Sequence, residues 1–202
     1  DEVMRQGVAR EGSDHAYYDF PDRQTYYRSE NMWERGPIFK AVTMNPVLLE
    51  AVAQCIGHPF LPINDSFVCK IPGGNVPVVW HQDPPYGYAK SPRLETFEVP
   101  NFDVDIYLDD STLENGCVWG MKGHHLVGKV NLQNYNEDEL FDNFGAVPME
   151  MKAGDVLFHS ISGPHGSRGN ETKSVRRIFY VHYMAREVVE GCYPGWQGKN
   201  AG

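Results

Sequence analysis

From residue 65 onward, the chain contains eight short stretches with the composition of β-strands. Together they are rich in valine, isoleucine and aromatic residues and are bounded by glycine, proline or asparagine. The stretches are 65–71 (DSFVCKI), 76–82 (VPVVWHQ), 102–110 (FDVDIYLDD), 117–121 (CVWGM), 128–132 (GKVNL), 146–151 (AVPMEM), 154–160 (GDVLFHS) and 174–185 (SVRRIFYVHYMA). Many short strands at such spacing predict a mostly β domain, either a sandwich or a barrel.

One helix is expected before these strands, over residues 45–57. Asn45 is a favourable N-cap, Pro46 suits the first helical position and Gly57 suits the C-terminal cap. Apolar residues recur between them at helical spacing, so one face of the helix should pack against the rest of the domain. The irregular polar segment 134–145 is predicted to be a surface excursion with a helical turn.

Length and composition limit the classes of protein that this chain can belong to. The 202 residues suffice for one core, so we expect residues 1–202 to form a single domain, whose N-terminus need not be complete because no methionine starts it. A formal charge of −9 argues against nucleic acid or an anionic membrane as a partner, and no apolar run could span a membrane. Four scattered cysteines favour a reducing, cytoplasmic location; nothing indicates the oligomeric state.

Two candidate metal ligands stand at the end of the apolar stretch 76–82. His81 and Asp83 are two positions apart, so on a strand they point to the same face while Gln82 points to the other. One short segment could therefore supply an imidazole nitrogen and a carboxylate oxygen to one metal ion. The simpler alternative is a histidine at a strand end that is hydrogen-bonded to a nearby aspartate.

A second stretch, residues 153–183, supplies the residues that such a site still needs. It contains His159 and His165, followed by a strand that opens with Arg176 and Arg177. Two histidines and one carboxylate form the ligand set of non-haem Fe(II) oxygenases, because three protein ligands on one side leave coordination positions open. An arginine can hold the far carboxylate of a dicarboxylate co-substrate through its planar fork. The apolar pattern does not decide between the two arginines.

Taken in order, these stretches resemble the phytanoyl-CoA dioxygenase family of Fe(II)- and 2-oxoglutarate-dependent oxygenases. The matching motifs run from about residue 39 to 184: NPVLLEAVAQCIG, KIPGG, WHQD, LDDSTLENGCVWGMKGHH and GDVLFHS…HGSRGN…VRR. The family fold is a double-stranded β-helix, a jelly-roll or cupin-like barrel with flanking helices. This implied fold agrees with the strand-rich pattern.

The resemblance implies a role for each candidate residue. His81, Asp83 and His165 take the positions of the Fe(II) ligands, and His159 becomes a neighbour. Arg176, eleven positions after His165, takes the position of the 2-oxoglutarate arginine. Ser167 and Gln82 occupy positions that can contact the co-substrate in relatives, although each could equally be a structural hydrogen-bonding residue.

The reaction implied is the oxidation, by hydroxylation in the usual case, of a C–H bond in a small-molecule substrate. It would consume 2-oxoglutarate and O2, release succinate and carbon dioxide, and use Fe(II). A carboxylate at Asp83 argues against a halogenase, whose relatives vacate this position for chloride. The alternative class is a non-catalytic or non-oxygenase metal-binding jelly roll, such as an isomerase or hydrolase, which would need no co-substrate arginine.

Two features depart from or extend the family pattern. Asp105 stands where some relatives carry a tryptophan, so one side of the pocket is expected to be rebuilt here. The segment 84–101, rich in proline and tyrosine, follows the first two ligands and is predicted to form a rim or lid over the substrate. A solvated loop is the alternative for this segment.

Overall fold

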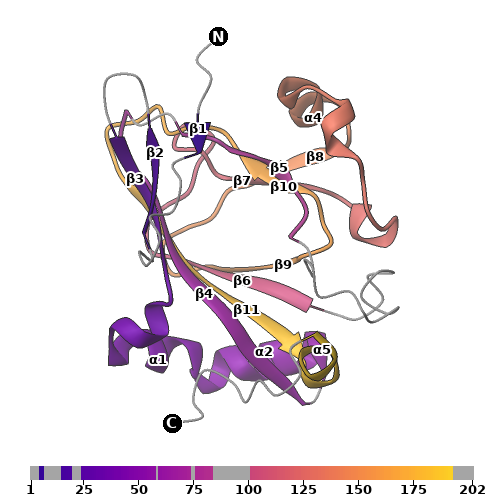
Figure 1. Cartoon of the computed structure of the whole chain (residues 1–202). Coiled ribbons are helices and arrows are strands. Elements are labelled where there is room, and N and C mark those ends of the chain that lie inside the picture. The colour runs from indigo at the N-terminus through magenta and orange to yellow at the C-terminus, as the bar shows by residue number, and fades with distance from the viewer. Residues whose placement is uncertain are drawn as a thin grey trace.

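The structure is a computed structural model and describes residues 5–6, 15–19, 24–57, 59–73, 76–83 and 101–192. Two antiparallel sheets face each other, with helices on their outer sides (Figure 1). The predicted mostly β architecture with flanking helices is confirmed. The segment 84–101, predicted to be a rim or lid, lies outside the described residues except for its last one.

The larger sheet has seven strands, and its strand order is not the chain order. From one edge to the other they are β1 (Arg5–Gln6), β2 (His15–Asp19), β3 (Gln24–Glu30), β4 (Phe60–Lys70), β11 (Arg176–Ala185), β6 (Asn101–Tyr107) and β9 (Val156–Ser160). The long strand β11 therefore lies between β4 and β6 and brings the end of the chain into the centre of the sheet.

The smaller sheet has four strands and carries part of the candidate site. Its order is β5 (Val78–His81), β10 (His165–Ser167), β7 (Val118–Met121) and β8 (Ala146–Met149). Helix α4 (Glu137–Asp142) covers its outer side, where Leu140 and Phe141 pack with Trp80. A capping box between Asn136 and Glu139 starts this helix, so the expected helical turn in 134–145 is confirmed.

The larger sheet is apolar on its outer side and polar on its inner side. Helices α1 (Pro37–Thr43) and α2 (Pro46–Ile56) lie against the outer side, where Val104, Phe179 and Val181 pack with Leu48 and Val52. Because side chains alternate along a strand, the residues between these positions face the smaller sheet. The inner side consequently carries Asp103, Asp105 and Tyr107 of β6, His159 of β9, and Arg176, Tyr180 and His182 of β11.

The predicted helix over residues 45–57 is confirmed in its details. The Asn45 side chain accepts hydrogen bonds from the backbone N–H groups of Val47 and Leu48 at 3.0 and 3.3 Å, and Gly57 ends the helix with φ of 85°. Further helical segments are η1 (Met32–Arg35), η2 (His124–Leu126), η3 (Leu132–Asn134) and α5 (Arg186–Cys192). None of the helices in the described ranges is long and apolar enough to cross a membrane.

One predicted strand, residues 128–132, is wrong. This stretch forms a loop that leads into η3, and its backbone bonds to a side chain instead of to a neighbouring strand. Gln82 accepts a hydrogen bond from Val130 N and donates one to Gly128 O, both at 2.8 Å. Conversely, the three-residue strand β10 and the strands β2 and β3 were not predicted from the sequence.

Candidate metal centre

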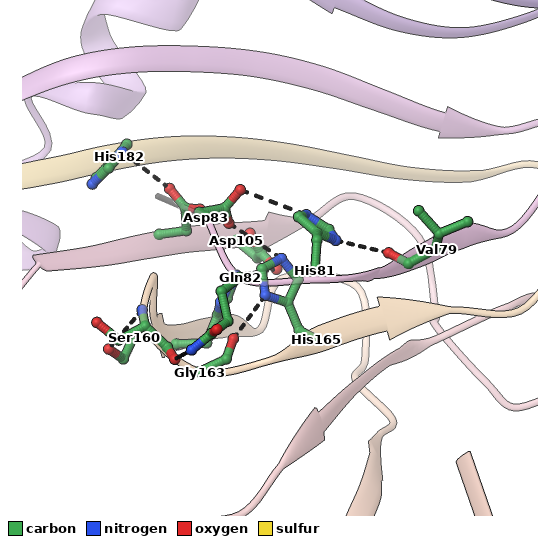
Figure 2. Close-up of polar contacts among 12 residues, drawn as sticks. Val79, His81, Gln82, Asp83, Asp105, Ser160, Gly163, His165 and His182 are labelled. Atoms are coloured by element: carbon green, nitrogen blue, oxygen red, sulfur yellow. Dashed lines mark hydrogen bonds and ion pairs between the residues drawn. The ribbon is translucent and has the colours of Figure 1, made fainter. Parts of the chain in front are cut away.

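His81, Asp83 and His165 come together between the two sheets. His81 ends β5, Asp83 follows it, and His165 opens β10, where it is the direct antiparallel partner of His81. One nitrogen or oxygen atom from each of the three lies within 4.8 Å of the others. Figure 2 shows their side chains pointing toward one another from adjacent strands. Long-range strand pairing thus assembles a group whose members are 84 positions apart in the sequence.

Both imidazole rings are held in the orientation that a metal ligand needs. His81 Nδ1 lies 2.8 Å from Val79 O, and His165 Nδ1 lies 3.0 Å from Gly163 O. A carbonyl oxygen only accepts, so Nδ1 carries the hydrogen in each ring. In an uncharged imidazole this leaves the Nε2 lone pair free to bind a metal, and the backbone contact fixes the direction in which it points.

The Asp83 carboxylate lies between the two Nε2 atoms. Its oxygens are 3.5 Å from His81 Nε2 and 3.2 Å from His165 Nε2. Burial alone would raise the pKa of Asp83, but His165 and His81 outweigh that effect and hold the pKa well below its usual range. An ionised carboxylate beside two oriented imidazoles is a donor set that fits Fe(II), and three ligands leave other coordination positions open.

His159 is close to this group but is directed elsewhere. Its ring centre lies 4.6 Å from that of His165, while its Nε2 lies 3.5 Å from Asp105 Oδ2. Burial would lower the pKa of His159, but Asp105 more than offsets this and the pKa is raised. The pairing with Asp105 agrees with the prediction that His159 is a neighbour of the ligand group.

The structure separates the two arginines that the sequence left open. Arg177 is exposed and forms a two-pronged ion pair with Asp109, at 2.7 and 2.8 Å. Arg176 is only 2% exposed and faces the inside of the barrel, where its Nη2 donates to Gly116 O at 2.8 Å. Only Arg176 is therefore positioned to meet a ligand between the sheets.

Lys70 is a second buried basic side chain beside Arg176, and the sequence motifs did not single it out. It is the direct partner of Arg176 on β4, and its ammonium donates to Val76 O and Arg168 O at 2.7 and 2.6 Å. Burial and the nearby Arg176 lower the pKa of Lys70. Among the described residues, Arg176 Nε and the neighbouring Tyr107 hydroxyl have no hydrogen-bond partner. The unused donors of Arg176 and Tyr107 are suited to an anionic ligand.

Ser167 and Gln82 occupy different environments. Ser167 is buried on β10, two positions after His165 and therefore on the same side of that strand. The Gln82 amide instead donates to Gly128 O at 2.8 Å and Ser162 O at 2.7 Å, and its oxygen accepts from Val130 N. Through these contacts, Gln82 links the segment that carries His81 and Asp83 to the 128–130 loop and to the turn before His165. Contact with a co-substrate stays a prediction for Ser167 and for Gln82.

Replacing Gln82 with glutamate should therefore lower stability markedly. The carboxylate keeps the shape of the amide but turns two donors into acceptors that face the carbonyls of Gly128 and Ser162. We expect a loss of about 3 kcal/mol, which lowers the melting temperature by about 6–12 °C in a chain of this size. The exposed Gln133→Glu is the matched control in thermal unfolding. Equal melting temperatures for the two variants would show that the Gln82 contacts contribute little.

Comparison with known proteins gives the family of this chain. The sequence profile of the phytanoyl-CoA dioxygenase family matches residues 4–178. The chain belongs to the phytanoyl-CoA dioxygenase family. This result confirms the resemblance inferred from the motifs.

Among curated relatives of this family member is the methylphosphonate hydroxylase of Gimesia maris, 29% identical over 138 residues, which are 67% of this chain and 50% of that protein. Phytanoyl-CoA dioxygenase 1 of Oryza sativa subsp. japonica is 25% identical over 171 residues, 81% of this chain and 58% of that protein. The chain thus spans between half and three fifths of the length of these relatives.

Several solved structures have folds similar to that of this chain. EvdMO1 is 27% identical with a TM-score of 0.69, over 86% of this chain and 39% of that one. EctD from S. alaskensis, crystallised with 2-oxoglutarate and 5-hydroxyectoine, is 17% identical with a TM-score of 0.68, over 83% of this chain and 59% of that one. At that identity the likeness to EctD shows the fold alone.

Proposed function

We propose that this protein is an Fe(II)- and 2-oxoglutarate-dependent dioxygenase that hydroxylates a C–H bond of a small-molecule metabolite and releases succinate and carbon dioxide. The observation that carries the proposal is the group His81, Asp83 and His165, with both Nε2 atoms directed at one carboxylate. Membership of the phytanoyl-CoA dioxygenase family supports the same reaction class.

In this proposal the three residues hold the metal, and the backbone carbonyls of Val79 and Gly163 keep the two rings in place. Bound Fe(II) supplies the oxygen chemistry, using the two electrons that decarboxylation of 2-oxoglutarate provides. The protein's own contribution is to orient the ligands, bind the co-substrate and place the substrate C–H bond while excluding water.

Arg176 is the residue that we assign to the far carboxylate of 2-oxoglutarate. It is buried, it faces the interior, and its unused donor Nε can complete a two-pronged contact with a carboxylate. Lys70 lies beside Arg176 across the two paired strands, and the Tyr107 and Ser167 hydroxyls can donate to the same anion.

Hydroxylation is the outcome that one relative favours. This curated relative is named a methylphosphonate hydroxylase. Its name points to a small-molecule substrate, in agreement with the acidic net charge that argues against nucleic acid.

The proposal is tested by anaerobic titration of the metal-free protein with Fe(II) and then with 2-oxoglutarate. We expect a visible absorption band that appears only when both are present and saturates at one equivalent of each. Binding of Fe(II) with no band on addition of 2-oxoglutarate would instead favour the non-oxygenase jelly roll.

A further inference from the structure

A row of four paired residues crosses the inner side of the smaller sheet at the level of the candidate metal ligands. His81 on β5 pairs with His165 on β10. His165 also pairs with Gly120 on β7, and Gly120 pairs with Val147 on β8. Directly paired residues of antiparallel strands lie on the same side of the sheet. The row therefore continues from the two histidines onto a residue that has no side chain.

The chain neighbours of Gly120 show which way the row faces. Trp119 and Met121 pack with Phe141 of helix α4, on the outer side of the smaller sheet. Because side chains alternate along a strand, position 120 faces the opposite way, toward the larger sheet. Gly120 thus lies between the two sheets, next to His165.

A glycine inside a strand costs stability, so its presence calls for a physical reason. At two nearby glycines the reason is the close approach of another backbone segment. A Cβ at Gly166 would lie 3.0 Å from Val78 O, and a Cβ at Gly116 would lie 2.4 Å from Arg168 O. A side chain at either position would collide with backbone, which cannot move aside easily.

Gly120 is not explained in this way. Among the described residues other than its chain neighbours, a Cβ at this position would come within 4 Å of Met149 only, at 3.1 Å from Cε and 3.7 Å from Sδ. The end of a methionine side chain adapts readily, so the fold does not require glycine here. Glycine in a strand also occurs where a ligand approaches the backbone closely. This second reason points to a ligand group beside His165.

The surroundings of Gly120 indicate that this ligand group is apolar. Val147 is 43% exposed although it faces the larger sheet. Val118 and Met149, which pair with each other on the same side, are also only partly buried. Neighbouring strands are about 4.8 Å apart, so His165 and Val147 are separated by roughly 10 Å with no side chain between them. We call the space over Gly120, bordered by Val118, Val147 and Met149, the glycine gap.

We propose that the glycine gap binds an uncharged hydrocarbon portion of the substrate and so holds the substrate beside the metal centre. This inference rests on the proposed function, because it assigns the gap to the substrate of that centre. Burial of apolar surface against Val147 and Met149 stabilises the complex. A heavily hydroxylated group would lose its water there without gaining hydrogen-bond partners. Gly120 is the specificity-determining residue, because a larger side chain would fill the gap.

The test uses two probes with the same six-membered ring, cyclohexanol and myo-inositol, the second of which carries a hydroxyl on every carbon. Each is titrated into protein loaded with Zn(II), which replaces Fe(II) without redox chemistry, and with 2-oxoglutarate, and binding is followed by saturation-transfer NMR. We expect cyclohexanol to bind and myo-inositol not to bind. Gly120→Leu should weaken cyclohexanol binding at least about tenfold, because the leucine side chain occupies the gap, and should leave the 2-oxoglutarate affinity unchanged.

Val147→Thr tests the same gap without adding volume, and it carries the test should Gly120→Leu fail to fold. It replaces a methyl group with a hydroxyl and should weaken cyclohexanol binding about fourfold, the effect of one methylene-sized apolar contact. Val156→Thr is the matched control. Val156 is 37% exposed, but it pairs with Ile106 on the outer side of the larger sheet, so cyclohexanol binding should not change.

Thermal unfolding separates a glycine kept for a ligand from a glycine that the fold requires. Gly120→Ala should not lower the melting temperature, because alanine suits a strand better than glycine and only the end of Met149 has to move. Gly166→Ala, on the neighbouring strand, should lower it by about 2–12 °C, because its Cβ meets backbone. An equal fall in both variants would show that the fold requires Gly120 and would remove the basis of the inference.

Three binding results would also overturn the inference: myo-inositol that binds as tightly as cyclohexanol, no binding of cyclohexanol, or unchanged cyclohexanol affinity in both Gly120→Leu and Val147→Thr. A 2-oxoglutarate affinity that falls together with the cyclohexanol affinity would assign the gap to the co-substrate instead. Failure of the proposed function is seen separately, as a missing absorption band in the optical titration with Fe(II) and 2-oxoglutarate. None of the probe measurements depends on turnover.

Discussion

Replacing His165 with alanine is expected to lower the affinity for Fe(II) at least about 100-fold, because changes that only disturb the partners of metal ligands already cost 10- to 100-fold. Asp83 would lose its nearest imidazole, 3.2 Å away, and two ligands would remain. Isothermal titration with Fe(II) under nitrogen measures the affinity, and succinate release measures turnover, which should fall in parallel.

The matched control is His159→Ala, which removes a histidine whose ring lies 4.6 Å from that of His165 but which faces Asp105. This variant should bind Fe(II) with an affinity close to that of the unmodified protein. The opposite pattern, with normal binding in His165→Ala and lost binding in His159→Ala, would show that the third ligand has been assigned to the wrong histidine.

The second large effect is expected at Arg176. Arg176→Gln should raise the dissociation constant for 2-oxoglutarate roughly 100-fold, since removing one partner of a buried, hydrogen-bonded charge pair costs about 2–5 kcal/mol. Fe(II) affinity should be unchanged, which distinguishes loss of co-substrate binding from loss of the metal centre. Titration of the Fe(II)-loaded protein with 2-oxoglutarate gives both quantities.

Arg177→Gln is the control for this prediction, because it changes the adjacent arginine on the exposed side of β11. Arg177 pairs with Asp109 outside the barrel, so 2-oxoglutarate affinity should stay the same. An equal loss of 2-oxoglutarate affinity in Arg176→Gln and Arg177→Gln would mean that the overall positive charge attracts the co-substrate. The buried guanidinium group of Arg176 would then have no special role in binding it.

The sequence predicted those parts of the fold that depend on local patterns. The helix at 45–57 has its own capping residues, and the strands containing His81, Asp105 and Arg176 follow from composition and turn residues. The loop at 128–132 was mistaken for a strand because its valine and leucine have strand composition. Its backbone partner is the Gln82 side chain, and no local pattern reveals a contact across 46 positions.

Sequence motifs predicted the candidate metal ligands but not their surroundings. The spacing of His81 and Asp83 places both on one side of a strand, and the structure brings His165 to them. Strand register could not be predicted, so the sequence did not show that Lys70 lies opposite Arg176 or that Asp103 pairs with His159 and His182. Nor did it show that backbone carbonyls fix both imidazoles, because this depends on folded turn geometry.

The most direct test of the proposed chemistry is oxygen exposure of the anaerobic complex with Fe(II) and 2-oxoglutarate, with succinate quantified in the unmodified protein and in His165→Ala. In the unmodified protein we expect the visible band to decay as succinate forms. In His165→Ala we expect neither a visible band nor succinate. Folded, iron-loaded protein that binds 2-oxoglutarate but forms no succinate in air would contradict the assignment as a dioxygenase.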